Sequence, residues 1–176
     1  MKLNVHDIDA EVKDLIYSEP TEQLNAEIVH GGVQDFEFTD KAQVHLQYHR
    51  TGDDLVFLGR IAGKVIGHCA RCLEPYPFDL AADCSLIVVP KPDVSEEAEL
   101  ADEDLNLSFY QGDEIDLSPL IREQLILALP TKPLCSEDCQ GLCPQCGINR
   151  NQQSCDCSDQ GGDPRLAVLR NLKVPR

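Results

Sequence analysis

The alternation of apolar and polar residues between positions 33 and 89 is typical of a β-sheet. A period of two places every second side chain on the same face of a strand, and these runs are rich in β-branched and aromatic residues. The alternating runs are 33–39, 42–50, 54–69 and 84–90. Residues 51–54, Thr-Gly-Asp-Asp, have turn chemistry, so residues 42–66 are predicted to form an antiparallel hairpin.

One helix is predicted over residues 117–129, from the sequence 116-DLSPLIREQLILALP-130. Asp116 or Ser118 can cap its amino end, and Pro119 suits the first turn. Its apolar residues, which fall on adjoining helical positions, are Leu120, Ile121, Leu125, Ile126 and Leu129. We expect this stripe to cover one face of the sheet.

The two ends of the chain have weaker patterns. Residues 2–5 are consistent with a short strand, and no helix is predicted in residues 1–30. A short helix is predicted over residues 164–174, with three leucines on one side and basic residues between them.

Charge is distributed unevenly over the 176 residues, whose formal net charge is −16. Residues 1–140 hold 10 Lys and Arg against 28 Asp and Glu, whereas residues 141–176 hold 5 against 3. The acidic loop predicted over residues 91–115 contributes strongly to this imbalance. A body this acidic repels phosphate, so any contact with nucleic acid is expected to be local or indirect.

No motif of an enzyme is present. The sequence has no P-loop, no Gly-rich dinucleotide turn and no serine nucleophile elbow, and its histidines are scattered. No run of about 18 apolar residues exists that would span a membrane, and residues 1–7 do not resemble a secretion signal. We therefore predict a cytoplasmic protein that is not an enzyme and has no small-molecule substrate.

The nine cysteines carry the strongest signal of chemistry in the chain. In a reducing compartment they favour metal binding over disulfides. Their spacing is Cys69-x2-Cys72, then Cys135-x3-Cys139-x3-Cys143-x2-Cys146, then Cys155-x-Cys157, with Cys84 in an apolar strand. A Cys-x-x-Cys turn followed by glycine, as in 143-CPQCG-147, can direct two thiolates at one ion, which is the geometry of a zinc knuckle.

Two groups of four metal ligands are predicted. The first is Cys143, Cys146, Cys155 and Cys157, and the second is Cys69, Cys72, Cys135 and Cys139. Cys-x-Cys is a less common half-site, so Cys135 and Cys139 are an alternative partner pair for Cys143 and Cys146. The second group requires the tail to fold back on the sheet. Zinc is favoured over an iron–sulfur cluster, as one or two structural ions, because four thiolates leave no open position for water.

The predicted fold is α+β, with an antiparallel sheet or partly closed β-barrel, a packed helix and a C-terminal tail that resembles a zinc knuckle. The predicted division is an α+β body over residues 1–134, which includes the acidic loop 91–115, and a cysteine-rich tail over residues 135–176 that packs on the body. Cys84 is expected in the core.

The chain resembles the YceD family, the large ribosomal RNA subunit accumulation proteins of bacteria and plastids. The segments that carry the resemblance are 69-CARCLEPY-76, 113-DEIDLSPLIREQLILALPTKPLC-135, 139-CQGLCPQCGINRNQQSCDC-157 and 163-DPRLAVLRNL-172. The resemblance implies a non-catalytic ribosome biogenesis factor, required for processing or accumulation of the large-subunit (23S) ribosomal RNA. Some members lack the tail thiols, so the tail metal site is not essential to the general role of the family.

Two kinds of partner are compatible with that role. If precursor RNA is bound directly, the candidate residues are Arg150, Arg165, Arg170, Lys173 and Arg176. The other route is an acidic body that holds a basic ribosomal or RNA-processing protein, and the charge distribution favours it. The alternative functions are a thiol-based redox or metal sensor that uses Cys69 and Cys72, and a generic zinc-knuckle adaptor between proteins.

Overall fold

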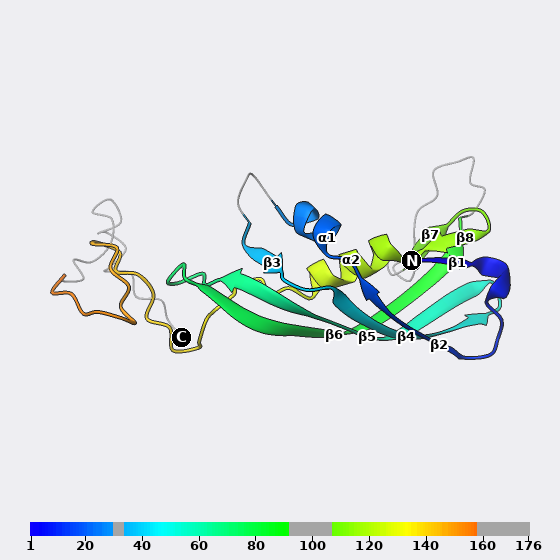
Figure 1. Cartoon of the computed structure of the whole chain (residues 1–176), viewed down its shortest axis with the longest axis horizontal. Coiled ribbons are helices and arrows are strands. Elements are labelled where there is room, and N and C mark those ends of the chain that lie inside the picture. Colours follow the sequence, from blue (N-terminus) through cyan, green and yellow to red (C-terminus); the bar gives the residue numbers. More distant parts are fainter. Residues whose placement is uncertain (30–33, 92–106, 158–176) are drawn as a thin grey trace, which may run out of the picture.

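Three long antiparallel strands form the middle of the molecule (Figure 1). The structure is a computed structural model that describes residues 1–29, 34–91 and 107–157. β4 (Ala42–Thr51), β5 (Asp54–His68) and β6 (Pro75–Pro90) pair in chain order. Thr51 pairs with Asp54, so a two-residue turn joins β4 to β5. The predicted hairpin is therefore confirmed.

Shorter strands extend this sheet on both sides. β2 (Lys13–Glu19) pairs with β4, and β7 (Leu107–Tyr110) runs parallel to β6, which gives the order β2-β4-β5-β6-β7. β3 (Phe36–Phe38) pairs with the second half of β5, beyond the part that pairs with β4. The sheet is open, and a separate pair of strands, β1 (Lys2–Asn4) and β8 (Glu114–Asp116), lies at one end of the molecule (Figure 1).

Helix α2 (Leu117–Leu127) covers one face of the sheet together with the short α1 (Glu22–Glu27), as Figure 1 shows. The carboxylate of Asp116 caps α2 by accepting a hydrogen bond from Ser118 N at 3.1 Å. The α2 residues that are buried in the core are Leu117, Ile121 and Leu125. Full burial of one such side chain contributes about 2 kcal/mol to stability. The α+β fold class and the covering helix are confirmed.

The inner face of the sheet supplies the other half of the core. Alternate residues of β4, β5 and β6 point towards α2, as a period of two requires. The buried residues of these strands include Val44, Leu46, Leu55, Phe57, Ile61, Val65, Leu80, Cys84, Leu86 and Val88. Cys84 therefore lies in the core, as expected, where burial raises its pKa to about 11.

The prediction of one acidic loop over residues 91–115 is wrong at its carboxyl end. Residues 107–110 and 114–116 form β7 and β8. Ile115 is buried and pairs with Leu3 of β1, so one apolar residue in an acidic context is enough to hold β8 in place. Residues 92–106 lie outside the described residues, as does the helix predicted over 164–174.

Two elements near the amino end were missed in the prediction, and one strand in the middle of the chain was shortened. β2 and α1 occupy residues for which no element was predicted, because Pro20 interrupts the pattern between them. β6 begins at Pro75, nine positions before the apolar run that predicted it, since pairing with β5 extends the strand through a less apolar segment. The short strand over residues 2–5 is confirmed as β1.

The backbones of β4 and β5 lie close together at Gly59 of β5. A Cβ atom at this position would lie 2.1 Å from the carbonyl oxygen of His45 and 2.7 Å from Leu46 Cα. Both atoms belong to the backbone of β4, so no side chain can move aside to make room. Only glycine allows the two backbones to approach this closely.

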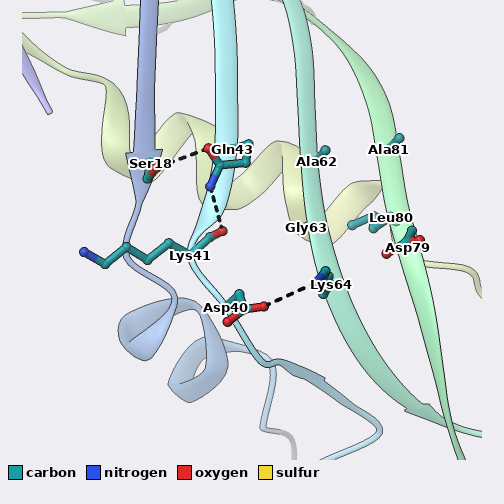
Figure 2. A pocket seen from close by; sticks show the side chains of 10 residues that line it. All are labelled: Ser18, Asp40, Lys41, Gln43, Ala62, Gly63, Lys64, Asp79, Leu80 and Ala81. Carbon is teal, nitrogen blue, oxygen red and sulfur yellow. Dashed lines mark hydrogen bonds and ion pairs between the residues drawn. The ribbon is translucent and has the colours of Figure 1, made fainter.

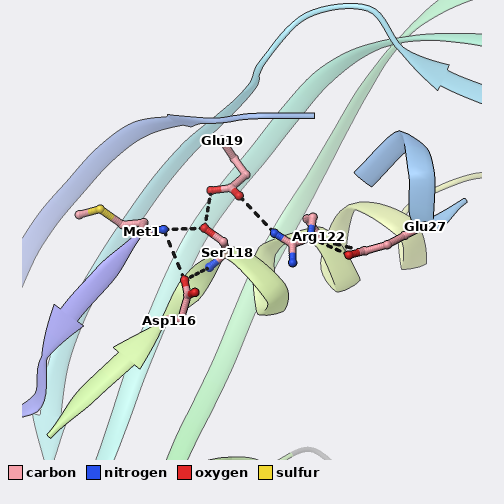
Figure 3. Close-up of polar contacts among 6 residues, drawn as sticks. All are labelled: Met1, Glu19, Glu27, Asp116, Ser118 and Arg122. Atoms are coloured by element: carbon pink, nitrogen blue, oxygen red, sulfur yellow. Dashed lines mark hydrogen bonds and ion pairs between the residues drawn. The ribbon is translucent and has the colours of Figure 1, made fainter. Parts of the chain in front are cut away.

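A line of charged side chains joins α2 to the sheet and to α1 (Figure 3). Arg122 of α2, which is 8 % exposed, lies 3.6 Å from a carboxylate oxygen of Glu19, which is 3 % exposed. The Arg122 Nε atom also donates to Glu27 at 3.1 Å. Glu19 accepts a hydrogen bond from Ser118 Oγ at 3.0 Å, and the amino group of Met1 donates to the same hydroxyl group. These contacts fix the position of α2 along the sheet.

We predict that Arg122→Met lowers the free energy of unfolding by about 3 kcal/mol, because Glu19 is left buried without its counter-charge. Urea unfolding at neutral pH measures this change. The matched control is Arg60→Met, which breaks an ion pair with Asp83 whose side chains are 72 % and 86 % exposed, and should cost less than about 0.5 kcal/mol. Equal losses in both variants would contradict the role given to Arg122.

Candidate metal centre

Four cysteines from two distant segments meet at the end of the sheet, and we call them the hairpin cluster. Cys69 and Cys72 lie in the turn between β5 and β6, whereas Cys135 and Cys139 follow α2. Their Sγ atoms all lie within 4.8 Å of one another. The Sγ atoms of Cys69 and Cys139 are 3.7 Å apart, and those of Cys72 and Cys135 are also 3.7 Å apart.

These separations fit a tetrahedral metal site. Four sulfurs at about 2.3 Å from one zinc ion lie about 3.8 Å from each other, whereas the sulfurs of a disulfide are only about 2.05 Å apart. All nine cysteines are free thiols in the structure. The cluster can therefore hold one metal ion without a change in the backbone.

The turn that presents Cys69 and Cys72 is held by its own backbone hydrogen bonds. Cys69 N donates to Glu74 O at 3.0 Å, and Leu73 N donates to Cys69 O at 2.9 Å. Leu73 has φ of 61° and an exposed side chain. This left-handed conformation costs a non-glycine residue about 1 kcal/mol. Strain of this kind persists only where the surrounding contacts fix the backbone.

The segment after α2 forms hydrogen bonds with the turn between β5 and β6. Ala70 N donates to Pro133 O at 2.8 Å, and Leu142 N donates to Arg71 O at 3.0 Å. The guanidinium group of Arg71 donates to the carbonyl oxygens of Glu137 and Cys139, both at 2.9 Å. The segment that carries Cys135 and Cys139 therefore contacts the β5–β6 turn at the end of the sheet, which brings these two cysteines to the first Cys-x-x-Cys pair. Packing of the whole tail on the body stays a prediction.

Four of the other five cysteines form a second group, the tail cluster: Cys143, Cys146, Cys155 and Cys157. Their Sγ atoms also lie within 4.8 Å of one another. Cys143 N donates to Ile148 O at 2.8 Å and Gly147 N donates to Cys143 O at 2.9 Å, which closes the tight turn of a zinc knuckle. The tail cluster is more exposed than the hairpin cluster, since Cys143 alone among its members is buried.

The thiol groups in each cluster do not ionise alike. Burial disfavours the thiolate of Cys69, but backbone hydrogen bonds at Cys135, Cys72 and Arg71 outweigh it and lower the pKa of Cys69 to about 6. Backbone hydrogen bonds from Cys146 and Gln145 lower the pKa of Cys143 to about 6. Each cluster is thus prepared to hold at least one thiolate near neutral pH.

At least one thiol in each cluster has a raised pKa and resists ionisation. Burial, followed by the neighbouring cysteines, raises the pKa of Cys135 to about 12. The neighbouring thiol of Cys146 and then burial raise the pKa of Cys157 to about 12. Four thiolates at these distances repel one another unless a cation lies among them, and a metal ion deprotonates the thiols that it binds. The donor set therefore fits a divalent metal.

Two side chains that were not predicted from the sequence make contacts at Cys139. One contacts its sulfur atom and the other its carbonyl oxygen. The carboxamide of Asn151 donates to Cys139 Sγ at 3.3 Å, and Arg71 holds the backbone of the same segment. Neither stands out in sequence, although Arg71 lies between the two cysteines of the first Cys-x-x-Cys pair. The only signal for Asn151 in the sequence is that it lies in the polar loop between Cys146 and Cys155.

Arg150, a candidate for RNA contact, lies at the tail cluster. Its guanidinium group is 3.7 Å from Cys143 Sγ, and this contact raises the pKa of Arg150. A cation here offsets the negative charge of the thiolates. Contact with RNA stays a prediction for Arg150, and the other candidates, Arg165, Arg170, Lys173 and Arg176, lie outside the described residues.

A hollow on the open face of the sheet has different chemistry. It has a volume of about 610 Å³ and is lined by polar and small apolar residues of β2, β4, β5 and β6 and of the segment before β4 (Figure 2). Ser18 Oγ donates to Gln43 at 3.2 Å, and Lys64 pairs with Asp40 at 3.9 Å. These side chains are engaged with one another and include no nucleophile and base pair.

Comparison with known proteins identifies the family. The family model described as "Large ribosomal RNA subunit accumulation protein YceD" matches residues 57–173. The chain belongs to the YceD family. The matched range begins in β5 and includes all eight cysteines of the hairpin and tail clusters. The resemblance seen in the sequence is confirmed.

Several known proteins are similar to this chain over part of their own length. A Mycobacterium tuberculosis protein described as uncharacterized is 29% identical over 130 residues, which cover 74% of this chain and 61% of the relative. The chloroplastic YCED homolog 1 of Zea mays is 32% identical over 58% of this chain and 44% of its own. YceD of Haemophilus influenzae is 33% identical over 56% of this chain and 57% of its own. No solved structure matches the chain significantly.

The name of the family describes accumulation of ribosomal RNA and not a reaction. The described part of this YceD chain contains no helix long and apolar enough to cross a membrane. Its most distinctive chemistry is therefore the pair of cysteine clusters, which fit metal ions.

We predict that Gly141→Ala loosens the contact between the tail and the β5–β6 turn. A Cβ atom at Gly141, whose φ is +70°, would lie 3.0 Å from Arg71 O. The clash should weaken the hydrogen bond from Leu142 N to Arg71 O and speed hydrogen exchange of the Leu142 amide about tenfold.

The matched control is Gly147→Ala. Gly147 has a similar φ of +74°, but a Cβ atom there would have nothing within 4 Å. Both variants carry the backbone strain, so only Gly141→Ala should change exchange at Leu142. The same exchange rate in the two variants would show that the Arg71 contact does not hold the tail.

Proposed function

We propose that this YceD family member is a non-catalytic ribosome biogenesis factor that supports processing or accumulation of the large-subunit (23S) ribosomal RNA in the cytoplasm. Family membership carries this proposal, since relatives from Haemophilus influenzae and Zea mays are named for accumulation of that RNA. The chain covers only 61% of the first relatives' length, so activity and partners are carried over as proposals.

The proposed cofactor is structural zinc, with one ion in each cluster. The 3.7 Å sulfur separations and the all-thiolate donor sets support zinc. A four-sulfur site is closed to water, so its role is to hold chain segments together and not to activate a nucleophile. The ligands of the hairpin cluster would join the sheet to the tail, and those of the tail cluster would close the knuckle.

The proposed partner is a basic ribosomal or RNA-processing protein. The acidic body, with 10 Lys and Arg against 28 Asp and Glu over residues 1–140, supports this choice over direct contact with precursor RNA. At the tail, Arg150 is already engaged with Cys143. Direct RNA binding is the second route and would depend on the basic residues of the tail.

The zinc proposal predicts two zinc ions per purified chain and one in Cys69→Ser, because loss of one ligand opens the hairpin cluster only. Cys84→Ser is the matched control, since Cys84 is a buried thiol outside both clusters, and it should keep two ions. Elemental analysis with thiol titration measures both. No zinc together with nine reactive thiols in the folded chain would overturn the proposal.

The proposed function predicts that depletion of the protein in its native host lowers the ratio of 23S to 16S ribosomal RNA. Wild-type protein should restore the ratio, and Cys69→Ser with Cys72→Ser should not, because the tail is released. An unchanged ratio on depletion would contradict the assembly role. A double variant that folds and keeps both metals but fails to restore the ratio would instead support the redox sensor.

A further inference from the structure

The loop of the tail cluster reaches into the hairpin cluster through one side chain. Asn151 lies in the loop between the two halves of the tail cluster, yet its Nδ2 atom donates to Cys139 Sγ of the hairpin cluster at 3.3 Å. The same carboxamide accepts a hydrogen bond from Gln140 N at 2.8 Å. Both groups of this side chain therefore contact the segment that carries Cys139.

The position of Asn151 depends on the fold of the tail cluster. Its backbone and side-chain nitrogens both donate to Asn149 Oδ1, at 3.0 and 2.8 Å. Asn149 pairs with Leu142 in an antiparallel bridge, next to the hydrogen bond from Cys143 N to Ile148 O. The loop is thus closed at its base by Cys143, and its other end leads to Cys155. Ligation of these cysteines by one ion would fix the loop that holds Asn151.

We propose that the two clusters bind metal with positive cooperativity and that Asn151 is the positioning residue that couples them. The inference rests on the metal sites of the proposed function and adds how their occupancy is linked. A metal in the tail cluster orders the loop, and the ordered Asn151 then donates to a sulfur ligand of the hairpin cluster. Donors to a metal ligand of this kind change metal affinity by about 10- to 100-fold.

The coupling also acts in the opposite direction. A metal in the hairpin cluster fixes Cys139 and the backbone of Arg71, to which Leu142 N donates at 3.0 Å. Leu142 directly precedes Cys143, and Arg150 N donates to Gly141 O at 2.9 Å on the other side of the loop. Both contacts bring the halves of the tail cluster towards their liganded positions. Reciprocal coupling of this kind is a thermodynamic requirement for linked binding sites.

The first test uses the unmodified full chain and needs no variant. Metal-free protein is mixed with one equivalent of Zn²⁺ and its species are counted by native mass spectrometry. Two independent sites of equal affinity leave about half of the chains with one ion, and unequal independent sites leave more. Cooperative binding predicts that well under half carry one ion, with most chains empty or carrying two. A one-ion fraction of half or more, together with an unchanged hairpin-cluster affinity when the tail cluster is disabled, would overturn the proposal.

The second test identifies the coupling residue. Chelator competition measures the Zn²⁺ affinity of the hairpin cluster. In the double variant Cys146→Ser with Cys155→Ser the tail cluster is disabled, and the affinity of the hairpin cluster should fall about tenfold. Asn151→Asp keeps the acceptor for Gln140 N but replaces the donor to Cys139, and should cause a similar fall. Combining them should add little, because both remove the same interaction.

Gln152→Glu is the matched control. It adds the same charge one residue away, on an exposed side chain, and should leave hairpin-cluster affinity unchanged. An equal loss in Gln152→Glu and Asn151→Asp would assign the effect to charge and overturn the role of Asn151. Absence of zinc from the wild-type chain would instead defeat the metal sites themselves, which keeps the two failures distinguishable.

Discussion

The meeting of Cys69 and Cys72 with Cys135 and Cys139 is the constraint on which the rest of the tail depends. The sulfur pairs in this cluster join residues 63 and 70 positions apart in sequence. The neighbouring backbone hydrogen bonds contribute about 1 kcal/mol each and lie partly at the surface. A shared metal ion would supply far more binding energy than these bonds, because structural zinc contributes its binding energy directly to folding. The position of the later residues that the structure describes, 140–157, follows from this junction.

Helix α2 determines where the second half of that junction arrives. Its buried face and the pairing of Arg122 with Glu19 fix the helix along the sheet, and Pro130 and Pro133 follow its end. The chain then runs to the end of the sheet at which β5 turns into β6 (Figure 1). Pro133 O accepts the Ala70 hydrogen bond there, so the packing of α2 places Cys135 within reach of Cys72.

Charge is distributed unevenly over the molecule. The body is strongly acidic, whereas Arg71 of the body and Arg150 of the tail lie beside the cysteine clusters. A zinc ion with four thiolates carries a net negative charge, which nearby guanidinium groups and amide donors offset. Arg150, whose guanidinium group lies 3.7 Å from Cys143 Sγ, is less available to phosphate while this contact is made.

Much of the fold followed from local pattern. Alternation predicted the β4–β5 hairpin, and a capped apolar stripe predicted α2, since both signals lie within a few residues of the structure that they form. The same reasoning missed β2, α1 and β8, whose short or interrupted patterns are stable only through pairing and burial against distant segments. Asn151 and Arg71 were missed for a similar reason, because hydrogen bonds across the tail leave no periodic trace.

The sequence by itself determined which residues can form metal sites, because Cys-x-x-Cys spacing is a local property of the backbone and thiol chemistry is a property of the side chain. It left open whether Cys135 and Cys139 join the first pair or the tail pair. Only the tertiary structure decided this, since α2 packs on the sheet and delivers these two cysteines to the β5–β6 turn. Non-local partners are selected by the packing of whole elements, which spacing within a short segment cannot encode.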